Sequence, residues 1–168
     1  ENLVQEGNFS LDPEKEDVHI NVENFVTEDQ GADAGGRMHI GRSRNDQTAC
    51  DMRLYLRSSC LNLFFAVKNF ASALLLKAEE NAESVMPGFT HYQPAMVTSW
   101  GHWLCSYIQG LCRDLERLAF ALSLVNRNPL GAAAAFGTSW PIDRALTTKL
   151  LAFEKIDFNT LDCIVSRW

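Results

Sequence analysis

The chain has 168 residues, of which 46% are hydrophobic and 21% charged, and a formal net charge of −6. This composition is typical of a globular protein with one sizeable core, and the acidic balance argues against a general nucleic-acid binder. The longest apolar stretches fall short of about 18 uncharged residues, so the sequence predicts no membrane span. Five cysteines without a C-x-x-C pair favour reduced thiols in a cytosolic protein.

The N-terminal part is expected to form a short helix followed by a loop. Apolar residues recur with helical spacing between residues 16 and 26, which predicts the helix. Residues 27–36 are acidic and rich in glycine, which indicates the loop. We expect residues 1–36 to end an N-terminal helical domain and residues 37–168 to begin a central helical-bundle domain, both within a longer chain.

Two long helices are expected in the central part. The first should begin near Asn45, where Ser43 and Asp46 have the spacing of a capping box, and should end at Pro87 and Gly88. It is apolar on several faces, which is typical of a helix surrounded by others. The second helix carries a heptad pattern, which favours bundle packing, at Leu104, Ile108, Leu111, Leu115, Leu118, Leu122 and Val125.

The remaining pattern is also helical. Pro129 ends the second long helix, and a shorter helix should run from about Pro141 to Leu151. Alternation of apolar and polar residues is nearly absent, so few strands are expected. The sequence therefore predicts an all-α fold, built as a bundle of long helices.

The segment GRSRNDQ, residues 41–47, gathers two arginines, a hydroxyl and an amide at the start of the first long helix. Helix N-termini present unpaired N–H groups and a positive dipole end, which favour carboxylates. Gly41 permits close backbone approach, Ser43 and Asn45 can donate to an anion, and an arginine can grip a carboxylate with two parallel hydrogen bonds. The segment is either a carboxylate site or an ordinary capped helix whose arginines pair with surface acids.

A second candidate is MPGFTHYQPA, residues 86–95, in which prolines and a glycine bracket a rigid turn. The turn carries Thr90, His91 and Gln93. A histidine beside a hydroxyl is suited to general acid–base catalysis. A structural histidine whose hydrogen bonds are satisfied is the alternative.

A third candidate is NPLGAAAAFGTSWPIDR, residues 128–144. Its small residues permit close backbone approach, and Thr138 and Ser139 add hydroxyls. The segment is not a P-loop, because no Gly-Lys-Ser/Thr follows, and tight helix packing is the alternative.

The remaining histidines are weaker candidates. His19 and His39 can line a site, whereas His102 is expected to be structural. The sequence contains no HExxH pattern and no second ligand at helical spacing, so we expect no metal site.

These segments together resemble the argininosuccinate lyase family of the fumarase/aspartase superfamily. EDVH, GRMHIGRSRNDQ, MPGFTHYQPA, NPLGAAAAFGTSWPIDR and NTLDCIVSR occur in the order and spacing found in that family, over residues 16–167. The resemblance implies reversible elimination of argininosuccinate to arginine and fumarate, without a metal or organic cofactor. It assigns proton transfer to His91 and substrate contacts to Ser43, Arg44, Asn45, Thr90 and Gln93.

The resemblance also implies a cytoplasmic homotetramer whose active sites are shared between subunits, acting on a small molecule and on neither nucleic acid nor membrane. The family's serine loop, GSSxMPxKxN, does not occur in this sequence, so we expect the chain alone to be inactive. Ile40 stands where the family usually has a small hydroxyl residue, which leaves open a lyase releasing fumarate from another N-substituted aspartate, such as ethylenediamine-disuccinate lyase. A non-catalytic structural homologue, as in the delta-crystallins, is a further alternative.

Overall fold

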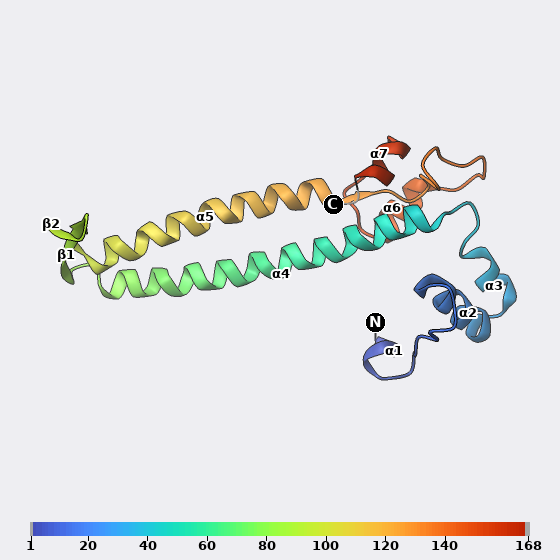
Figure 1. Cartoon of the computed structure of the whole chain (residues 1–168), viewed down its shortest axis with the longest axis horizontal. Helices are drawn as coiled ribbons and strands as arrows, with labels where there is room; N and C mark the ends of the chain where they lie inside the picture. Colours follow the sequence, from blue (N-terminus) through green and yellow to red (C-terminus); the bar gives the residue numbers. More distant parts are fainter. Residues whose placement is uncertain (1, 167–168) are drawn as a thin grey trace. The chain divides into compact units, whose positions relative to one another are not determined.

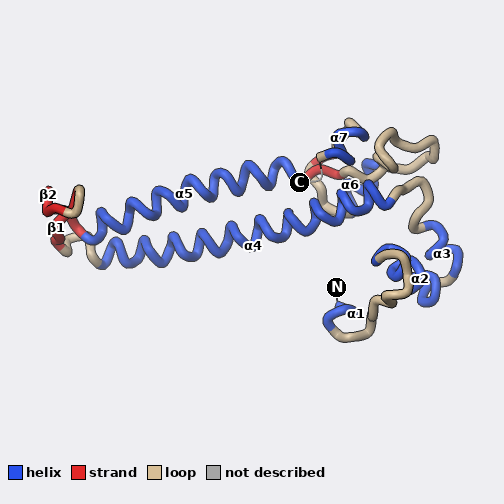
Figure 2. Tube along the Cα trace, in the orientation of Figure 1, coloured by secondary structure: helices blue, strands red, loops and turns tan. Residues whose placement is uncertain are grey.

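The computed structural model describes residues 2–166, and Arg167, the last residue of the NTLDCIVSR segment, lies outside them. Most described residues are helical (Figures 1 and 2). The helices are α1 (Asn2–Gln5), α2 (Val18–Gln30), α3 (Ala32–Arg37), α4 (Arg44–Glu80), α5 (Trp100–Val125), α6 (Arg144–Leu150) and α7 (Thr160–Val165). The strands are β1 (Val85–Thr90), β2 (Gln93–Ser99), β3 (Arg127–Asn128) and β4 (Lys155–Ile156).

The predicted helical fold is confirmed in its main elements. The long helix α4 begins one residue before Asn45 and ends at Glu80, a few residues earlier than expected. Helix α5 contains the whole heptad pattern and ends before Pro129, and α6 corresponds to the shorter helix predicted after Pro141.

Two local predictions were wrong. Residues 27–36 are mostly helical, because α2 continues to Gln30 and α3 follows after Gly31. Residues 85–99 form an antiparallel hairpin of β1 and β2 that the sequence did not indicate. Strands are recognised in a sequence by alternating apolar and polar residues. The sequence of this hairpin lacks that alternation, although the burial of β1 alternates between exposed and half-buried over residues 85–88.

The chain divides into two compact units, each of which we describe by itself. Unit 1 comprises the residues up to Cys50, Asn128–Ala152 and the residues from Ile156 onward. Unit 2 comprises Asp51–Arg127 and Phe153–Lys155. The predicted domain boundary near residue 36 stays a prediction.

Unit 1 is held together largely by buried polar groups. Asn128 is fully buried, and its amide nitrogen donates to the hydroxyls of Thr147 at 2.9 Å and Thr148 at 2.8 Å. Arg144 donates to the carbonyls of Leu130 at 2.7 Å and Asp157 at 2.6 Å. Because buried polar groups are costly unless paired, these bonds fix the loop between β3 and α6.

Unit 2 is an antiparallel pair formed by α5 and most of α4, held at both ends. At one end Gly101 lies so close to Ala78 and Ala82 that a Cβ atom would be 2.7 Å from the Ala78 carbonyl oxygen. At the other end Arg57 donates to Oδ1 of Asn126 at 3.3 Å and lies over the Phe153 ring.

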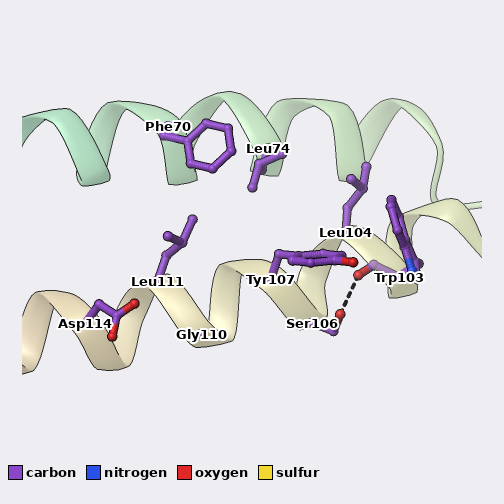
Figure 3. A pocket seen from close by; sticks show the side chains of 9 residues that line it. All are labelled: Phe70, Leu74, Trp103, Leu104, Ser106, Tyr107, Gly110, Leu111 and Asp114. Atoms are coloured by element: carbon purple, nitrogen blue, oxygen red, sulfur yellow. Dashed lines mark hydrogen bonds between the residues drawn. The ribbon is translucent and has the colours of Figure 1, made fainter.

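Between its two ends the helix pair encloses a largely apolar groove. Figure 3 shows side chains from both helices around a cavity of about 480 Å³. Phe70 and Leu74 of α4 face Leu104, Tyr107 and Leu111 of α5 across it (Figure 3). Two heptad residues of α5, Leu104 and Leu111, therefore line a groove rather than a closed core.

The helix α4 is also apolar enough, by length and composition, to cross a membrane, contrary to the expectation drawn from the sequence. Its most apolar stretch has a mean hydropathy of 1.5, and none of that stretch is buried. Length and composition do not distinguish a membrane span from a helix that other protein segments cover.

Candidate functional site

Ser43 immediately precedes α4 and caps it. Its Oγ accepts a hydrogen bond from the N–H of Asn45 at 3.3 Å, and its own N–H donates to Oδ1 of Asp46 at 3.0 Å. These bonds satisfy groups that an uncapped first turn leaves unpaired. The predicted capping box is confirmed, although the hydroxyl bonds to Asn45 rather than to Asp46.

The guanidinium of Arg44 is held by three protein groups. Its Nε donates to Oδ2 of Asp17 at 2.7 Å, and its Nη1 lies 2.9 Å from both Nδ1 of His39 and Oε1 of Gln47. A guanidinium can only donate, so Nδ1 of His39 accepts and carries no proton in this arrangement. The second terminal nitrogen, Nη2, takes no part in these bonds. Arg44 is therefore a fixed cation at the first turn of α4.

Asp17 anchors Arg44 from the start of α2. Its Oδ1 accepts a hydrogen bond from the N–H of Ile20 at 2.7 Å, which caps that helix. This bond, followed by the hydrogen bond and charge of Arg44, lowers the pKa of Asp17 although partial burial opposes the shift. The buried side chain of Asn21 fixes the preceding turn, because it bonds the N–H of Asp12 and the carbonyl of Asp17, each at 2.8 Å.

The third candidate segment lies against the first turn of α4, in the same unit. Asp46 is fully buried, and its Oδ2 accepts hydrogen bonds from the N–H groups of Gly131 at 3.0 Å and Ala133 at 2.9 Å. The amide nitrogen of Asn45 donates to the carbonyl of Ala134 at 3.3 Å. The structure thus brings two of the three predicted segments together.

The small residues of that segment permit the close approach that the sequence indicated. A Cβ atom on Gly131 would lie 2.7 Å from side-chain carbons of Arg144, and the backbone φ of Gly131 is 92°. Ala133 has a φ of 51°, which is unusual for a residue with a side chain. The segment is a loop, so the alternative of tight helix packing does not describe it.

Thr90, His91 and Gln93 lie on the hairpin of unit 2, and all three are exposed. Thr90 pairs with Gln93 at the end of the two strands, so His91 and Tyr92 form the turn. Their φ values of 51° and 61° belong to the left-handed region that two-residue hairpin turns require. Non-glycine residues in sparsely populated conformations cost about 1–3 kcal/mol each and are concentrated at functional sites.

The predicted site residues therefore fall into two groups. Ser43, Arg44 and Asn45 lie in unit 1, and Thr90, His91 and Gln93 lie in unit 2.

The other histidines differ in their surroundings. His39 contacts Arg44, and the charge of His19 contributes to the lowered pKa of Asp17, so both belong to the surroundings of that arginine. His102 lies in the first turn of α5, with Nδ1 2.7 Å from Oγ1 of Thr98, as expected of a structural residue.

The long-range hydrogen bonds of two carboxylates at this site were not predicted from the sequence. Asp17 appeared only within the EDVH segment, and its pairing with Arg44 joins residues 27 positions apart. Asp46 was recognised as a helix cap, but not as the acceptor for the loop at Gly131 and Ala133. The position of Asp17 directly before α2 could have identified it as a helix cap, because aspartate is a preferred residue there.

The arrangement around the first turn of α4 suits a carboxylate. It offers the positive end of a long helix, the fixed guanidinium of Arg44 and the hydroxyl of Ser43. His91 supplies an imidazole that can act as a general acid or base. These groups lie in separate units, the anion-binding groups in unit 1 and the imidazole in unit 2.

Comparison with known proteins gives consistent results. Residues 1–166 match the family described as Lyase. The argininosuccinate lyase of Neisseria gonorrhoeae is 48% identical over 164 residues, which cover 98% of this chain and 36% of that protein. The chain thus spans about a third of the length of the curated relatives that it matches.

Solved structures agree with the sequence relatives. An EDDS lyase in complex with formate has a TM-score of 0.82 and 33% identity, covering 89% of this chain and 30% of its own. A fumarate lyase:delta crystallin from Brucella melitensis, bound to cobalt, has the same fold at 20% identity, with a TM-score of 0.74 over 89% of this chain and 36% of its own. The chain therefore belongs to the Lyase family.

Proposed function

We propose that the protein to which this chain belongs is an argininosuccinate lyase, which splits argininosuccinate reversibly into L-arginine and fumarate. The observation that carries the proposal is the 48% identity to argininosuccinate lyases over 98% of the chain. The cluster of cationic and donor groups at residues 43–45 supports a carboxylate-bearing substrate.

In this proposal the first turn of α4 binds the carboxylates of the substrate. Removal of a proton beside a carboxylate creates a dianionic intermediate, so fixed positive charge and donors lower its energy. Nε and Nη1 of Arg44 are bonded within the protein, so we propose that this residue contacts the substrate through Nη2. Ser43 and Asn45 add hydrogen bonds at the helix N-terminus.

His91 takes part in proton transfer, and Thr90 and Gln93 bind substrate from the same turn. The strained backbone at His91 supports a functional turn. A proton must leave the carbon beside the carboxylate, and another must reach the departing guanidine nitrogen. No organic cofactor or metal is required for either transfer.

We further propose a cytoplasmic homotetramer with active sites shared between subunits. The exposed apolar side chains of α4 and α5 support an assembly that covers them. In this proposal residues 43–45 of one subunit and the hairpin turn of another subunit contribute to the same active site.

The proposal is tested with the full-length protein. We expect argininosuccinate to be converted to fumarate, whose ultraviolet absorbance gives the rate. Absence of fumarate release, with a folded protein and an active argininosuccinate lyase as positive control, would contradict the proposal.

A second candidate is a lyase that releases fumarate from a different N-substituted aspartate. It is favoured by the TM-score of 0.82 to an EDDS lyase and by Ile40. Ile40 lines a cavity of about 310 Å³ together with Arg42 and Ile142, in unit 1. Release of fumarate from ethylenediamine-disuccinate, but not from argininosuccinate, would move the assignment to this candidate.

A further inference from the structure

The buried carboxylate of Asp46 joins two segments that are 85 residues apart in the sequence. Three backbone N–H groups donate to it, those of Ser43 at 3.0 Å, Gly131 at 3.0 Å and Ala133 at 2.9 Å. A fully buried carboxylate is costly unless its oxygens accept hydrogen bonds. Since all three donors belong to the main chain, the carboxylate fixes the course of the backbone in both segments.

The loop bonded by Asp46 also orients a substrate-binding side chain. Ala134, the next residue after Ala133, accepts a hydrogen bond from Nδ2 of Asn45 through its carbonyl. The φ of 51° at Ala133 is maintained only when surrounding contacts impose it. The hydrogen bond from Ala133 to Asp46 is such a contact, so the position of the Ala134 carbonyl depends on it.

We infer that Asp46 is a positioning residue, which holds the turn at residues 43–45 and the loop at residues 131–134 in one fixed arrangement. Through that arrangement it orients Ser43 and Asn45 towards the substrate, and in this respect the inference rests on the proposed function. Helix capping alone does not account for Asp46, because capping uses only Oδ1, whereas Oδ2 bonds the distant loop.

The substitution Asp46→Asn tests the two carboxylate oxygens separately, because it keeps one acceptor atom and removes the other. An amide has one acceptor atom, and its nitrogen cannot accept from an N–H group. The orientation that retains more bonds directs the amide oxygen to Gly131 and Ala133 and leaves the N–H of Ser43 without its acceptor. The variant should therefore keep the loop in place and release the backbone of Ser43.

The first measurement is steady-state kinetics of the full-length protein with argininosuccinate. We expect Asp46→Asn to lower kcat/KM about 100-fold, mainly through a higher KM, because misplacement of binding groups by about 1 Å has effects of this size. Asp29→Asn, which removes an exposed carboxylate from α2 in the same unit, is the matched control and should behave as wild type. A merely structural role would reduce the folded fraction and hence the apparent kcat, with KM unchanged, and that result would overturn the inference, as would wild-type kinetics.

The second measurement is hydrogen exchange, which requires no catalysis. In Asp46→Asn the amide of Ser43 should exchange at least about tenfold faster, while the amides of Gly131 and Ala133 stay protected. If the wild-type protein released no fumarate, the proposed function would fail, and exchange would still decide whether Asp46 fixes these segments. Unchanged exchange at Ser43 would overturn the inference in either case.

Discussion

The side chain of Arg44 is positioned before any ligand is bound. Asp17, His39 and Gln47 hold its guanidinium from three different segments. A side chain that is already ordered loses less conformational entropy on binding than a mobile one. In the proposed function, Asp17 therefore favours the binding of a substrate carboxylate by Arg44, although its own charge is negative.

The substitution Asp17→Asn tests the ion pair and retains the helix cap, because asparagine also caps helices well. The pKa of Asp17 is lowered in the folded state, so its carboxylate stabilises the fold above the unfolded value near 3.8. This contribution is lost as the pH falls through the folded pKa. We expect the full-length wild type to exceed the variant in free energy of unfolding by about 0.5–1 kcal/mol at neutral pH.

Denaturant titration at about pH 6 and about pH 3 measures this difference, which should shrink at the lower pH. The variant Asp17→Ala removes the cap as well and should cost a further ~1 kcal/mol at both pH values. A difference between wild type and Asp17→Asn that is independent of pH would show that the ion pair does not contribute to stability.

His91→Asn tests proton transfer at the hairpin turn. Asparagine adopts positive φ more readily than most residues, so the turn should keep its conformation. We expect kcat of the full-length protein to fall about 10²–10⁴-fold with a smaller change in KM, because general acid–base catalysis contributes on that scale. Tyr92→Asn, at the other turn position, controls for the backbone and should retain most of the turnover. Near-normal turnover in His91→Asn would mean that this histidine is structural.

A contact could be predicted when its two residues are close together in the sequence, and not when they are far apart. The capping of α4 was predicted because Ser43 and Asp46 are three residues apart, and the helical period fixes their relative positions. The hydrogen bonds that Arg44 donates to Asp17 and that Gly131 donates to Asp46 were not predicted, because folding brings those partners together. Long-range pairing leaves no periodic pattern in a single sequence.

At the scale of elements, the two long helices were predictable and the hairpin between them was not. Helix α5 has a heptad pattern, and two of its heptad residues face α4 across the groove. Strand β1 carries apolar residues at both exposed and half-buried positions, such as Val85 and Met86, so its sequence does not alternate although its burial does. The segment was nevertheless expected to turn, since Pro87, Gly88 and Pro94 disfavour continuous helix.

The substitution Gly101→Ala is expected to destabilise the end of the helix pair at which α5 begins. A Cβ atom at this position would lie 2.7 Å from the carbonyl oxygen of Ala78 and 2.9 Å from Cα of Ala82. Both are backbone atoms, so the start of α5 must shift, and overpacking of this kind costs about 1–3 kcal/mol. Denaturant titration of the full-length protein should show a free energy of unfolding that is lower by this amount.

The matched control is Gly36→Ala in α3, where a Cβ atom would meet nothing within 4 Å. Alanine favours helix over glycine by about 0.5–1 kcal/mol, so this variant should be unchanged or more stable. Equal effects of the two substitutions would show that α4 and α5 do not meet closely at Gly101.

At the scale of the whole molecule, the chain leaves much apolar surface uncovered. Leu63 of α4 is 51% exposed, Phe70 57% and Leu76 61%, whereas Tyr107 of α5 is 53% exposed and Phe120 66%. Soluble monomers rarely expose large contiguous apolar patches. The relatives that match the chain are nearly three times its length, since it spans 36% of the first of them. We propose that the corresponding remaining segments of the full-length protein, together with other subunits, pack against the exposed apolar side chains of α4 and α5.

The 168-residue chain studied alone is therefore expected to self-associate and to lack lyase activity. Each exposed apolar square ångström contributes about 25 cal/mol when it is buried, so side chains along two long helices favour association strongly. Catalysis should be absent because the family's serine loop does not occur in this sequence. Sedimentation should give species larger than a monomer, a hydrophobic dye should bind any monomer that remains, and argininosuccinate should yield no fumarate. A compact, soluble monomer that binds no dye would show that the apolar faces of α4 and α5 are covered within the chain itself.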